Sequence, residues 1–561
     1  MPRTLIGLAL ATAIAFGLAG CAGRSASHDH QGTGHPALAQ PGGPPPALAT
    51  NLGTHTYRVT TASPTVQAYF DQGLRLLWAF NHVEAQRAFV EAARLDPGCV
   101  MCFWGVAHTA GSNYNSPTDA AREGVAWQAI QQALAVAGRV SERERALVEA
   151  LARRHSANPQ AERAPLDQAY ADAMREVMRR YPDDLEAATL FADAMMNLRP
   201  WNLWNLDGTP QPGTEELVQA LEGVLARNPN HPGANHLYIH AVEASANPGK
   251  AEAAADRLVK LMPGAGHMVH MPSHTYWRIG RYADAYAVNI QAIEADQAAF
   301  RRSPSTGFYR MMYYPHNIDF VWHVAGMQGR ASETLRAARE LAAAVPGESL
   351  AEMGNMEFTH AAPILALARF GQWAELLATP APQESRPYVL GIWRYGRGLA
   401  LAATGRRAEA EAELAALRTF ADGVTPTRTV ANFFRTAEML RFAADVLAGE
   451  IAARAGQTDE AVRYLTGVVG QQDTHWFIEP PPWYYPVRHS LGAALLAGGR
   501  AAEAEAVYRE DLRRNPENGW SLFGLAQALR AQGKAGEAAE VDARFKQAWA
   551  RADVTLTASR F

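Results

Sequence analysis

Residues 488–518 read RHSLGAALLAGGRAAEAEAVYREDLRRNPEN, and this stretch decides the fold. Two alanine-rich segments flank Gly499, and apolar residues in each recur every three or four positions, which predicts two amphipathic helices. The small residues Gly492 and Ala504 let the two helices cross closely, and Pro516 ends the second because proline cannot continue a helix. No run of Val, Ile and Thr alternates at period two, so the pattern favours helix over strand.

The same spacing of small and apolar residues recurs elsewhere in the chain. The matching positions are Gly73, Ala85, Phe89, Ala92 and Pro97; Gly398, Gly405, Ala410 and Leu414; and Gly456, Ala461 and Leu465. Trp520, Phe523 and Gly524 begin a further unit. A period near 34 residues with two helices per unit indicates an array in which each repeat packs against its neighbours.

These positions resemble the tetratricopeptide repeat pattern over about residues 65–550, most clearly at both ends. The resemblance implies an all-α solenoid, a right-handed superhelix of antiparallel helix pairs. It also implies a concave groove that is lined by the first helix of each pair and commonly binds a protein or peptide partner. It implies no reaction, so function has to be inferred from the residues that line the groove.

Composition excludes several classes of protein. The chain has 561 residues with 48% hydrophobic and 19% charged side chains, which is typical of a folded protein. Its net charge of −4 lacks the basic character of a nucleic-acid binder, so no nucleic-acid partner is expected. After the N-terminus no apolar run reaches the length of about 20 residues that a membrane span needs. Three cysteines are too few for a disulfide-rich scaffold.

The N-terminus predicts export and a lipid anchor. Arg3 precedes an apolar stretch from Leu5 to Leu18, so residues 1–20 are interpreted as a signal peptide. The sequence Leu-Ala-Gly-Cys at residues 18–21 resembles a bacterial lipobox, which implies cleavage before Cys21 and its acylation; the alternative is an ordinary secretory signal with a chance cysteine. Residues 21–60 are predicted to be a flexible Gly- and Pro-rich tether, and 61–561 the solenoid. The expected location is the cell envelope, periplasmic or at the outer membrane, with the membrane contacted through the lipid alone.

Histidines gather in the central repeats, residues 230–330. Gly249, Gly280 and Gly329 serve as the expected turn glycines, and potential metal ligands precede each of them at three equivalent positions. The residues 13 positions before are His236, His267 and His316; nine or ten before are His240, His270 and Asp319; six before are Glu243, His274 and His323. At 3.6 residues per turn, each set of three lies on one face of its helix.

Imidazoles with a few carboxylates suit a transition metal such as copper, zinc or iron, whereas calcium prefers oxygen ligands. Nine candidates exceed one coordination sphere, so either two metals bind or some of these residues orient ligands or contact a substrate. The alternative is that the histidines hydrogen-bond one another or a polar peptide.

Other features leave alternatives open. Cys99 and Cys102 are interpreted as a disulfide, a soft copper(I) site with Met101, or two free thiols. Aromatic insertions at 300–314 and 201–204 predict either a lid over the groove or a packed outer patch, and the loop at 475–484 is rigid and aromatic.

Three functions follow from this sequence. The favoured one is an anchored solenoid whose central groove binds a transition metal and a small ligand or peptide. The second is a metal-free scaffold for envelope proteins. The third is a metal-dependent hydrolase or oxidoreductase in which Glu243 or Asp319 moves protons.

Overall fold

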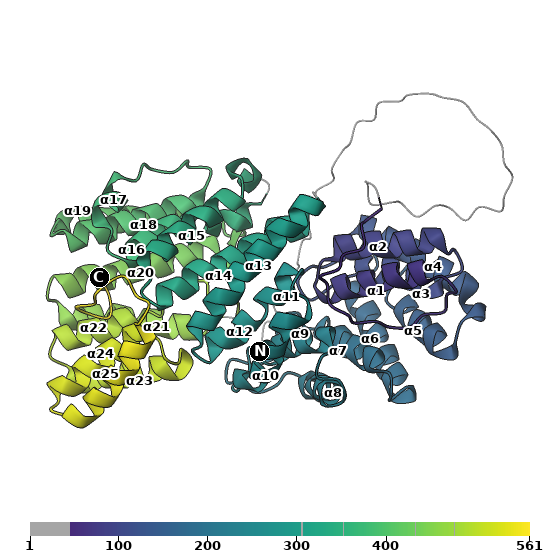
Figure 1. Ribbon diagram of the computed structural model, residues 1–561. Helices are drawn as coiled ribbons and strands as arrows, with labels where there is room; N and C mark the ends of the chain where they lie inside the picture. Colours follow the sequence, from purple (N-terminus) through teal and green to yellow (C-terminus); the bar gives the residue numbers. More distant parts are fainter. Residues whose placement is uncertain (1–44, 304–306, 352, 432–433, 476) are drawn as a thin grey trace, which may run out of the picture. The chain divides into compact units, whose positions relative to one another are not determined.

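The computed structural model describes residues 45–303, 307–351, 353–431, 434–475 and 477–561 (Figure 1). The described chain is all-α apart from one two-stranded ribbon, and successive helices pack in pairs as in tetratricopeptide repeats. The predicted fold class is therefore confirmed. The predicted signal peptide and the acylated Cys21 lie outside the described residues.

The helices up to residue 302 form the N-terminal part of the array. They are α1 (Pro64–Trp78), α2 (His82–Leu95), α3 (Val100–Ala110), α4 (Ala120–Val136), η1 (Ala137–Arg139), α5 (Glu142–Ala152), α6 (Arg163–Arg180), α7 (Leu185–Met196), α8 (Thr214–Arg227), α9 (Pro232–Val242), η2 (Pro248–Ala251), α10 (Glu252–Leu261), α11 (Gly266–His270), α12 (Pro272–Arg278) and α13 (Tyr282–Arg302).

The remaining elements follow the insertion at 303–308. They are the π-helical turn η3 (Tyr309–Tyr313), α14 (Tyr314–Met327), α15 (Ala331–Ala344), η4 (Gly347–Ala351), η5 (Gly354–Met356), α16 (Glu357–Arg369), α17 (Trp373–Ala378), α18 (Pro387–Ala403), α19 (Arg407–Gly423), β1 (Thr429–Val430), β2 (Phe434–Arg435), α20 (Thr436–Arg454), α21 (Thr458–Asp473), α22 (Arg488–Ala497), α23 (Ala501–Arg514), α24 (Gly519–Ala531) and α25 (Ala535–Ala548). The two strands pair antiparallel, with Thr429 opposite Arg435.

Turn glycines separate the two helices of most pairs. Gly280 lies between α12 and α13 with φ of 83°, and Gly329 lies between α14 and α15 with φ of 70°. Glycine adopts this left-handed backbone without the steric cost that a Cβ brings. Gly249 also lies between two helices, α9 and α10, but it belongs to the 3-10 helix η2 and does not adopt the left-handed backbone.

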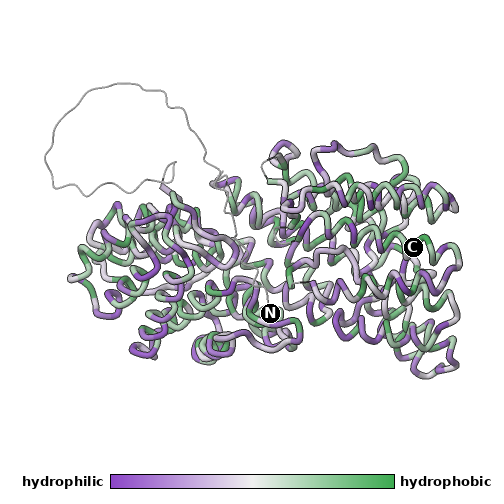
Figure 2. The backbone as a smooth tube through the Cα atoms, turned by 180° about the vertical axis from the view of Figure 1, so that it is seen from behind, coloured by the Kyte–Doolittle hydropathy of each residue, from purple (hydrophilic) through white to green (hydrophobic). Residues whose placement is uncertain are grey.

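Two hydrophobic cores meet at α14, which is buried on nearly every side. Phe320, Val324 and Met327 belong to the core that extends toward the N-terminus. Ile318, Val321 and Trp322 belong to the core that extends toward the C-terminus. Figure 2 shows the corresponding alternation of hydrophobic and hydrophilic residues along the helices. The helix that carries three predicted ligands thus lies where the two cores join.

The segment before α1 packs on the helices. Leu52 and Tyr57 are buried, and the Tyr57 hydroxyl donates to an Asp184 carboxylate oxygen over 2.7 Å. The Ala49 amide donates to the Gln72 side-chain oxygen over 2.7 Å. Residues 45–60, assigned to the tether from their composition, therefore lie against α1 and the start of α7. Among the described helices none is both long and apolar enough to cross a bilayer.

Candidate metal centre

Three first helices carry the nine predicted residues, and these helices contact one another (Figure 1). His236 and His240 lie on α9 with Glu243 directly after it; His267 and His270 lie on α11, His274 on α12, and His316, Asp319 and His323 on α14. Pro272 begins α12 with Met271 alone between it and α11, because proline cannot donate the backbone hydrogen bond that would continue α11. Six of the seven histidines then form two groups that mix residues from different helices.

The first triad consists of His236, His240 and His267. One ring nitrogen of each lies within 4.8 Å of the others, and all three rings are buried. His236 Nε2, His240 Nε2 and both ring nitrogens of His267 have no hydrogen-bond partner. A buried nitrogen without a partner costs about 1–3 kcal/mol, and four such nitrogens converge in a group that could hold a metal ion.

The second triad consists of His270, His274 and His316, whose nitrogens also lie within 4.8 Å of one another. His270 Nε2 and His274 Nε2 are 2.9 Å apart. Two nitrogens bound at 2.0–2.1 Å to one tetrahedral ion are about 3.3 Å apart, so a shared ion needs the two rings to separate by a few tenths of an ångström. The Phe320 ring packs against all three imidazoles, at centroid distances of 4.8, 5.0 and 5.1 Å.

Hydrogen bonds from the Nδ1 atoms to neighbouring oxygens set the tautomers of two histidines in the first triad. His236 Nδ1 donates to the Trp78 carbonyl oxygen over 2.5 Å, and His240 Nδ1 donates to Glu243 Oε1 over 2.9 Å. The proton of each neutral ring is therefore on Nδ1, and the lone pair is on Nε2. Imidazole ligands of metals are held in this way, with the second nitrogen on a carbonyl or carboxylate oxygen.

The second triad is oriented similarly. His270 Nδ1 is 2.6 Å from Asn289 Oδ1, and the Asn289 amide group donates to the Ala285 carbonyl over 2.7 Å, which fixes Oδ1 as the acceptor. His274 Nδ1 donates to Glu243 Oε2 over 2.6 Å. Glu243 thus accepts from His240 of one triad and His274 of the other. Glu243 is a predicted ligand, and with His240 and His274 it forms a further group that could hold a metal ion. Its two oxygens accept from the Nδ1 atoms of these two histidines.

Burial keeps most of these imidazoles neutral. It lowers the pKa of His236, His267 and His270 well below the usual range, and neighbouring imidazoles lower it further. Burial and the charge of His274 lower the pKa of His316 to about 3. For His274, burial is outweighed by the Glu479 and Glu243 carboxylates, which raise its pKa to about 10. Neutral imidazole is the form that binds a metal.

Glu479 completes the site from the distant loop between α21 and α22. Its Oε2 is 2.6 Å from His274 Nδ1, which already contacts Glu243 Oε2 at the same distance. One N–H cannot serve both carboxylates, and Glu479 Oε1 has no partner. The sequence reasoning missed Glu479. Its only local signal is the position before Pro480–Pro482 in a loop noted for its aromatic residues.

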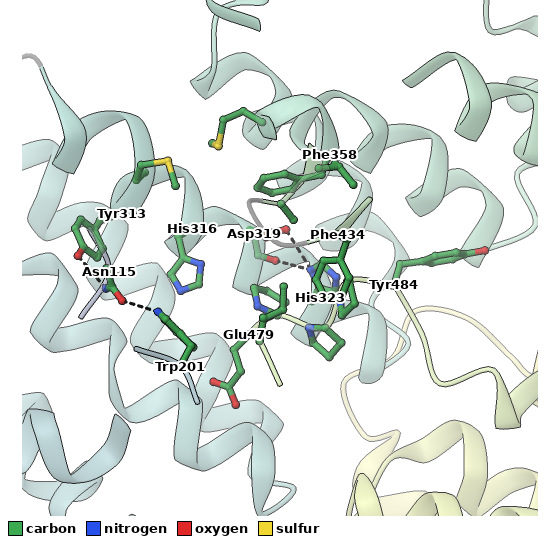
Figure 3. A pocket seen from close by; sticks show the side chains of 18 of the residues that line it. Asn115, Trp201, Tyr313, His316, Asp319, His323, Phe358, Phe434, Glu479 and Tyr484 are labelled. Carbon is green, nitrogen blue, oxygen red and sulfur yellow. Dashed lines mark hydrogen bonds and ion pairs between the residues drawn. The ribbon is translucent and has the colours of Figure 1, made fainter. Parts of the chain in front are cut away.

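A cavity of about 180 Å³ opens beside both triads (Figure 3). His240 and His267 of the first triad and His274 and His316 of the second line one side of it. The opposite side is apolar and comes mostly from the C-terminal core; it includes Phe358, Leu365, Tyr388, Val430, Phe434, Met439 and Tyr484. Ligands bound by the triads would therefore face a partly open, largely apolar space.

Asp319 and His323 lie in the cavity wall and not in either triad (Figure 3). Asp319 Oδ1 accepts from Trp322 Nε1 over 2.6 Å and is 3.2 Å from His323 Nδ1. The two residues form a pair of their own on α14, one and two turns beyond His316.

The three aromatic insertions contribute to the cavity. Trp201, Phe308, Met312 and Tyr313 line it, and Asn115 links two of them, donating to the Tyr313 hydroxyl over 2.9 Å and accepting from Trp201 Nε1 over 3.1 Å (Figure 3). Tyr309 positions the backbone of the first triad, because its hydroxyl accepts a hydrogen bond from the His267 amide over 3.0 Å.

A third cluster, His55, Glu186 and His231, has a different character. His231 Nδ1 accepts from the Ala234 amide over 3.1 Å at the start of α9, so its proton lies on Nε2 and points at Glu186 Oε2 over 3.2 Å. Glu186 Oε1 also accepts from Trp78 Nε1 over 2.6 Å. These bonds satisfy the cluster without an ion, and it serves as an internal comparison for the two triads.

The surroundings of Glu186 make the stability of the folded protein depend on pH. Burial alone would raise the pKa of Glu186, but the charges of His231 and His55 and their hydrogen bonds outweigh it and hold the pKa well below its ordinary range. The resulting stability is present above the unfolded-state pKa near 4.3 and is lost as the pH falls through the lower folded value.

We expect Glu186→Gln to destabilise the N-terminal repeats by about 3 kcal/mol at pH 7, and the difference from wild type to shrink below about pH 4. Urea unfolding at several pH values, with the exposed Glu176→Gln as control, measures this. If the free energies of unfolding of wild type and Glu186→Gln differed by the same amount at pH 3 and pH 7, the lowered pKa of Glu186 would be contradicted.

Cys99 and Cys102 are joined by a disulfide at the start of α3. The Cys99 sulfur also accepts the Cys102 amide, in the position of a helix cap. Both residues are buried, and neither lines the cavity.

No protein-family model and no curated protein matches the chain. Among solved structures, a human IFIT1 dimer with m7Gppp-AAAA is 12% identical, with 87% of this chain and 91% of that chain covered and a TM-score of 0.30. The P58(IPK) TPR domain is also 12% identical, with coverages of 84% and 99% and a TM-score of 0.20. Neither likeness is close enough to carry a functional argument. The consecutive helix pairs themselves make the chain a tetratricopeptide-like helical repeat protein.

Proposed function

We propose that the protein binds two transition-metal ions, one in each histidine triad, and that a small ligand reaches them from the cavity. One observation carries the proposal. The tautomers of His236 and His240 are fixed by oxygen acceptors, and their free Nε2 atoms converge with His267, which has no partner on either nitrogen. Such a set of lone pairs is stable in a buried place only with a cation among them.

The alternative, a network of histidines bonded to one another, predicts N–H···N pairs. The first triad has none, although its rings are packed at centroid distances of 4.9 and 5.1 Å. In the second triad the raised pKa of His274 lets its Nε2–H donate to His270 Nε2 over 2.9 Å, so the contrast between the two interpretations rests on the first triad.

The cavity favours a small molecule over a peptide as the second ligand. Its volume of about 180 Å³ is below the usual range of drug-sized pockets, roughly 300–1,000 Å³. Glu479 and three successive prolines form part of its wall. This proposal replaces the long groove expected from the repeat pattern with a small, partly open cavity.

Metal analysis tests the proposal. Protein purified without chelators and dialysed against copper, zinc or iron is expected to retain two ions per chain. Chelation should lower its stability by about 2.7 kcal/mol per ion, or about 5 kcal/mol for two ions, relative to protein with free metal at 100 times each Kd. Hydrogen exchange should place that loss in α9 to α14, with little change in α20 to α25, because repeats couple mainly to their neighbours. Fewer than one ion retained from every metal would refute the site.

We also propose that Cys21 anchors the protein to a membrane of the cell envelope. The support is the sequence alone: an apolar stretch that ends in Leu18, Ala19, Gly20 and Cys21. Because several acyl chains give stable anchoring, Cys21→Ser is expected to move the protein from the membrane pellet to the soluble fraction. Cell fractionation with a salt wash measures this, with Cys99→Ser as the matched cysteine control. A serine variant that stays in the pellet would refute the anchor.

A further inference from the structure

The cavity beside the triads has room for one six-membered ring. Its volume is about 180 Å³. An engineered apolar cavity of about 150 Å³ in another protein admits one benzene molecule. The remaining space accommodates one or two further atoms on such a ring. Size therefore favours a ligand that consists of a single ring with a small substituent.

Aromatic side chains are frequent in the cavity wall. Phe358 comes from α16, Tyr388 from α18, Phe434 from β2 and Tyr484 from the α21–α22 loop (Figure 3). The Tyr484 hydroxyl is 2.9 Å from the Tyr395 hydroxyl, so Tyr484 adds mainly ring surface to the wall. Aromatic rings attract one another beyond the effect of the area that they bury. An aromatic ligand therefore fits this wall better than an aliphatic ring of the same size.

His323 offers the cavity a polar atom that belongs to neither triad. Its Nδ1 lies 3.0 Å from the Asp319 carbonyl oxygen and 3.2 Å from Asp319 Oδ1, so this nitrogen carries a proton. Trp322 Nε1 donates to the same Oδ1 over 2.6 Å, which holds the carboxylate in place. The imidazole lines the cavity and is 8% exposed, and within the described chain nothing hydrogen-bonds its Nε2. Asp319 thus positions the ring and leaves Nε2 to a ligand.

A hydroxyl group matches His323 in either protonation state. When the imidazole is neutral, Nε2 is an acceptor and a hydroxyl donates to it; when the imidazole is protonated, Nε2 donates and the hydroxyl accepts. A carboxylate can only accept, and a hydrocarbon ring leaves Nε2 without a partner. A hydroxyl on an aromatic ring therefore satisfies both this nitrogen and the aromatic wall.

Resting on the cavity of the proposed function, we propose that its small ligand is a phenol, a single aromatic ring with one hydroxyl group. The hydroxyl is hydrogen-bonded to His323 Nε2, and the ring packs against Phe358, Phe434 and Tyr484. None of these contacts involves an atom of either triad, so the phenol binds with or without metal. Asp319 is a positioning residue, because it holds the imidazole and does not itself contact the ligand.

Three probes of similar size test this inference. Full-length protein, both chelator-treated and metal-loaded, is titrated by calorimetry with phenol, toluene and cyclohexanol. Phenol is expected to bind with a Kd of about 1 mM or lower. Toluene lacks the hydroxyl and cyclohexanol lacks the aromatic ring, so each should bind roughly 5-fold more weakly or worse. A purely apolar cavity would prefer toluene to phenol, because the phenol hydroxyl would be buried without a partner.

Two variants and a control assign the contacts. His323→Phe keeps a ring of similar size and removes Nε2, so it should reverse the preference and bind toluene more tightly than phenol. Phe434→Ala removes ring contact from the wall and should weaken phenol and toluene alike, by roughly 10-fold. Glu438→Gln, exposed on α20 next to the cavity residue Met439, is the matched control and should change neither affinity.

The outcomes separate this inference from the metal sites. Phenol bound in preference to toluene by chelator-treated protein supports it, whatever the metal content. Toluene preferred by the unaltered protein, or no phenol binding by protein that retains two ions, overturns the phenol ligand and leaves the metal sites standing. Phenol binding that requires metal, or a preference for phenol that survives in folded His323→Phe, overturns His323 as the contact. Circular dichroism monitors the fold, and the probe comparison on the unaltered protein decides the inference even if a variant unfolds.

Discussion

Replacing Glu243 with alanine is expected to empty both metal sites at once. Its two carboxylate oxygens accept from His240 Nδ1 at 2.9 Å and His274 Nδ1 at 2.6 Å, so one side chain orients a ligand of each triad. Loss of a carboxylate that hydrogen-bonds a ligand histidine typically lowers metal affinity by about 10–100-fold. Here we expect this loss of affinity for both ions. Isothermal titration with the metal measures the two affinities.

Two variants sharpen this test. Asn289→Ala removes only the acceptor of His270 Nδ1, so it should weaken the second site and leave the first unchanged. Glu294→Ala, on the exposed face of the same helix α13, is the control for changes to that helix. If Glu243→Ala weakens one site alone, the carboxylate does not link the triads, and each must be oriented independently.

Removing one histidine from a triad is expected to remove one ion and leave the other. His236→Ala should abolish binding in the first triad, because two imidazoles remain for an ion that needs at least three ligands. His270→Ala should do the same in the second. We expect losses of more than roughly 100-fold in affinity at the affected triad, beyond the effect of an outer partner. Metal content should fall from two ions to one in each variant.

The double variant His240→Ala, His274→Ala takes one ligand from each triad and should leave no bound metal, whereas His475→Ala, outside both triads, should retain two ions. The fold should survive, since repeat stability comes mainly from Ala and Leu packing between helices. Circular dichroism measured beside metal content checks this. Two ions retained by the double variant would refute the triads, and unfolding of either single variant would make these histidines part of the core.

The sequence by itself determined the helices and the faces of the ligands. Small residues around Gly499 predicted the paired helices because close crossing requires them, and the same spacing recurs from α1 and α2 to α22 and α23. Spacings of three, four and seven residues placed each ligand set on one helical face. This holds for α9 even though Gly249 lacks the left-handed backbone of the other turn glycines, because the rise and rotation of an α-helix depend on local geometry alone.

Only the tertiary structure decided how those faces combine. His267 and His270 share one helix and yet belong to different triads, because α11 lies between α9 and α14 and its successive turns meet different neighbours. Such a division depends on the distance and rotation between helices. Close packing sets both, as where Trp78 fills the space beside Gly233 of α9, and a Cβ there would lie 2.5 Å from the indole.

For the same reason the sequence did not place Glu479 and Phe80 at the site. Both lie far from the histidines in sequence and reach them only through folding. No local periodicity connects residue 479 with residue 274, whereas their 2.6 Å contact is fixed by the packing of the α21–α22 loop against α12. The sequence therefore determined which residue types face the site and on which helices. The packing between helices decided that they form two triads around one shared carboxylate, because that arrangement depends on contacts between segments that the local sequence does not encode.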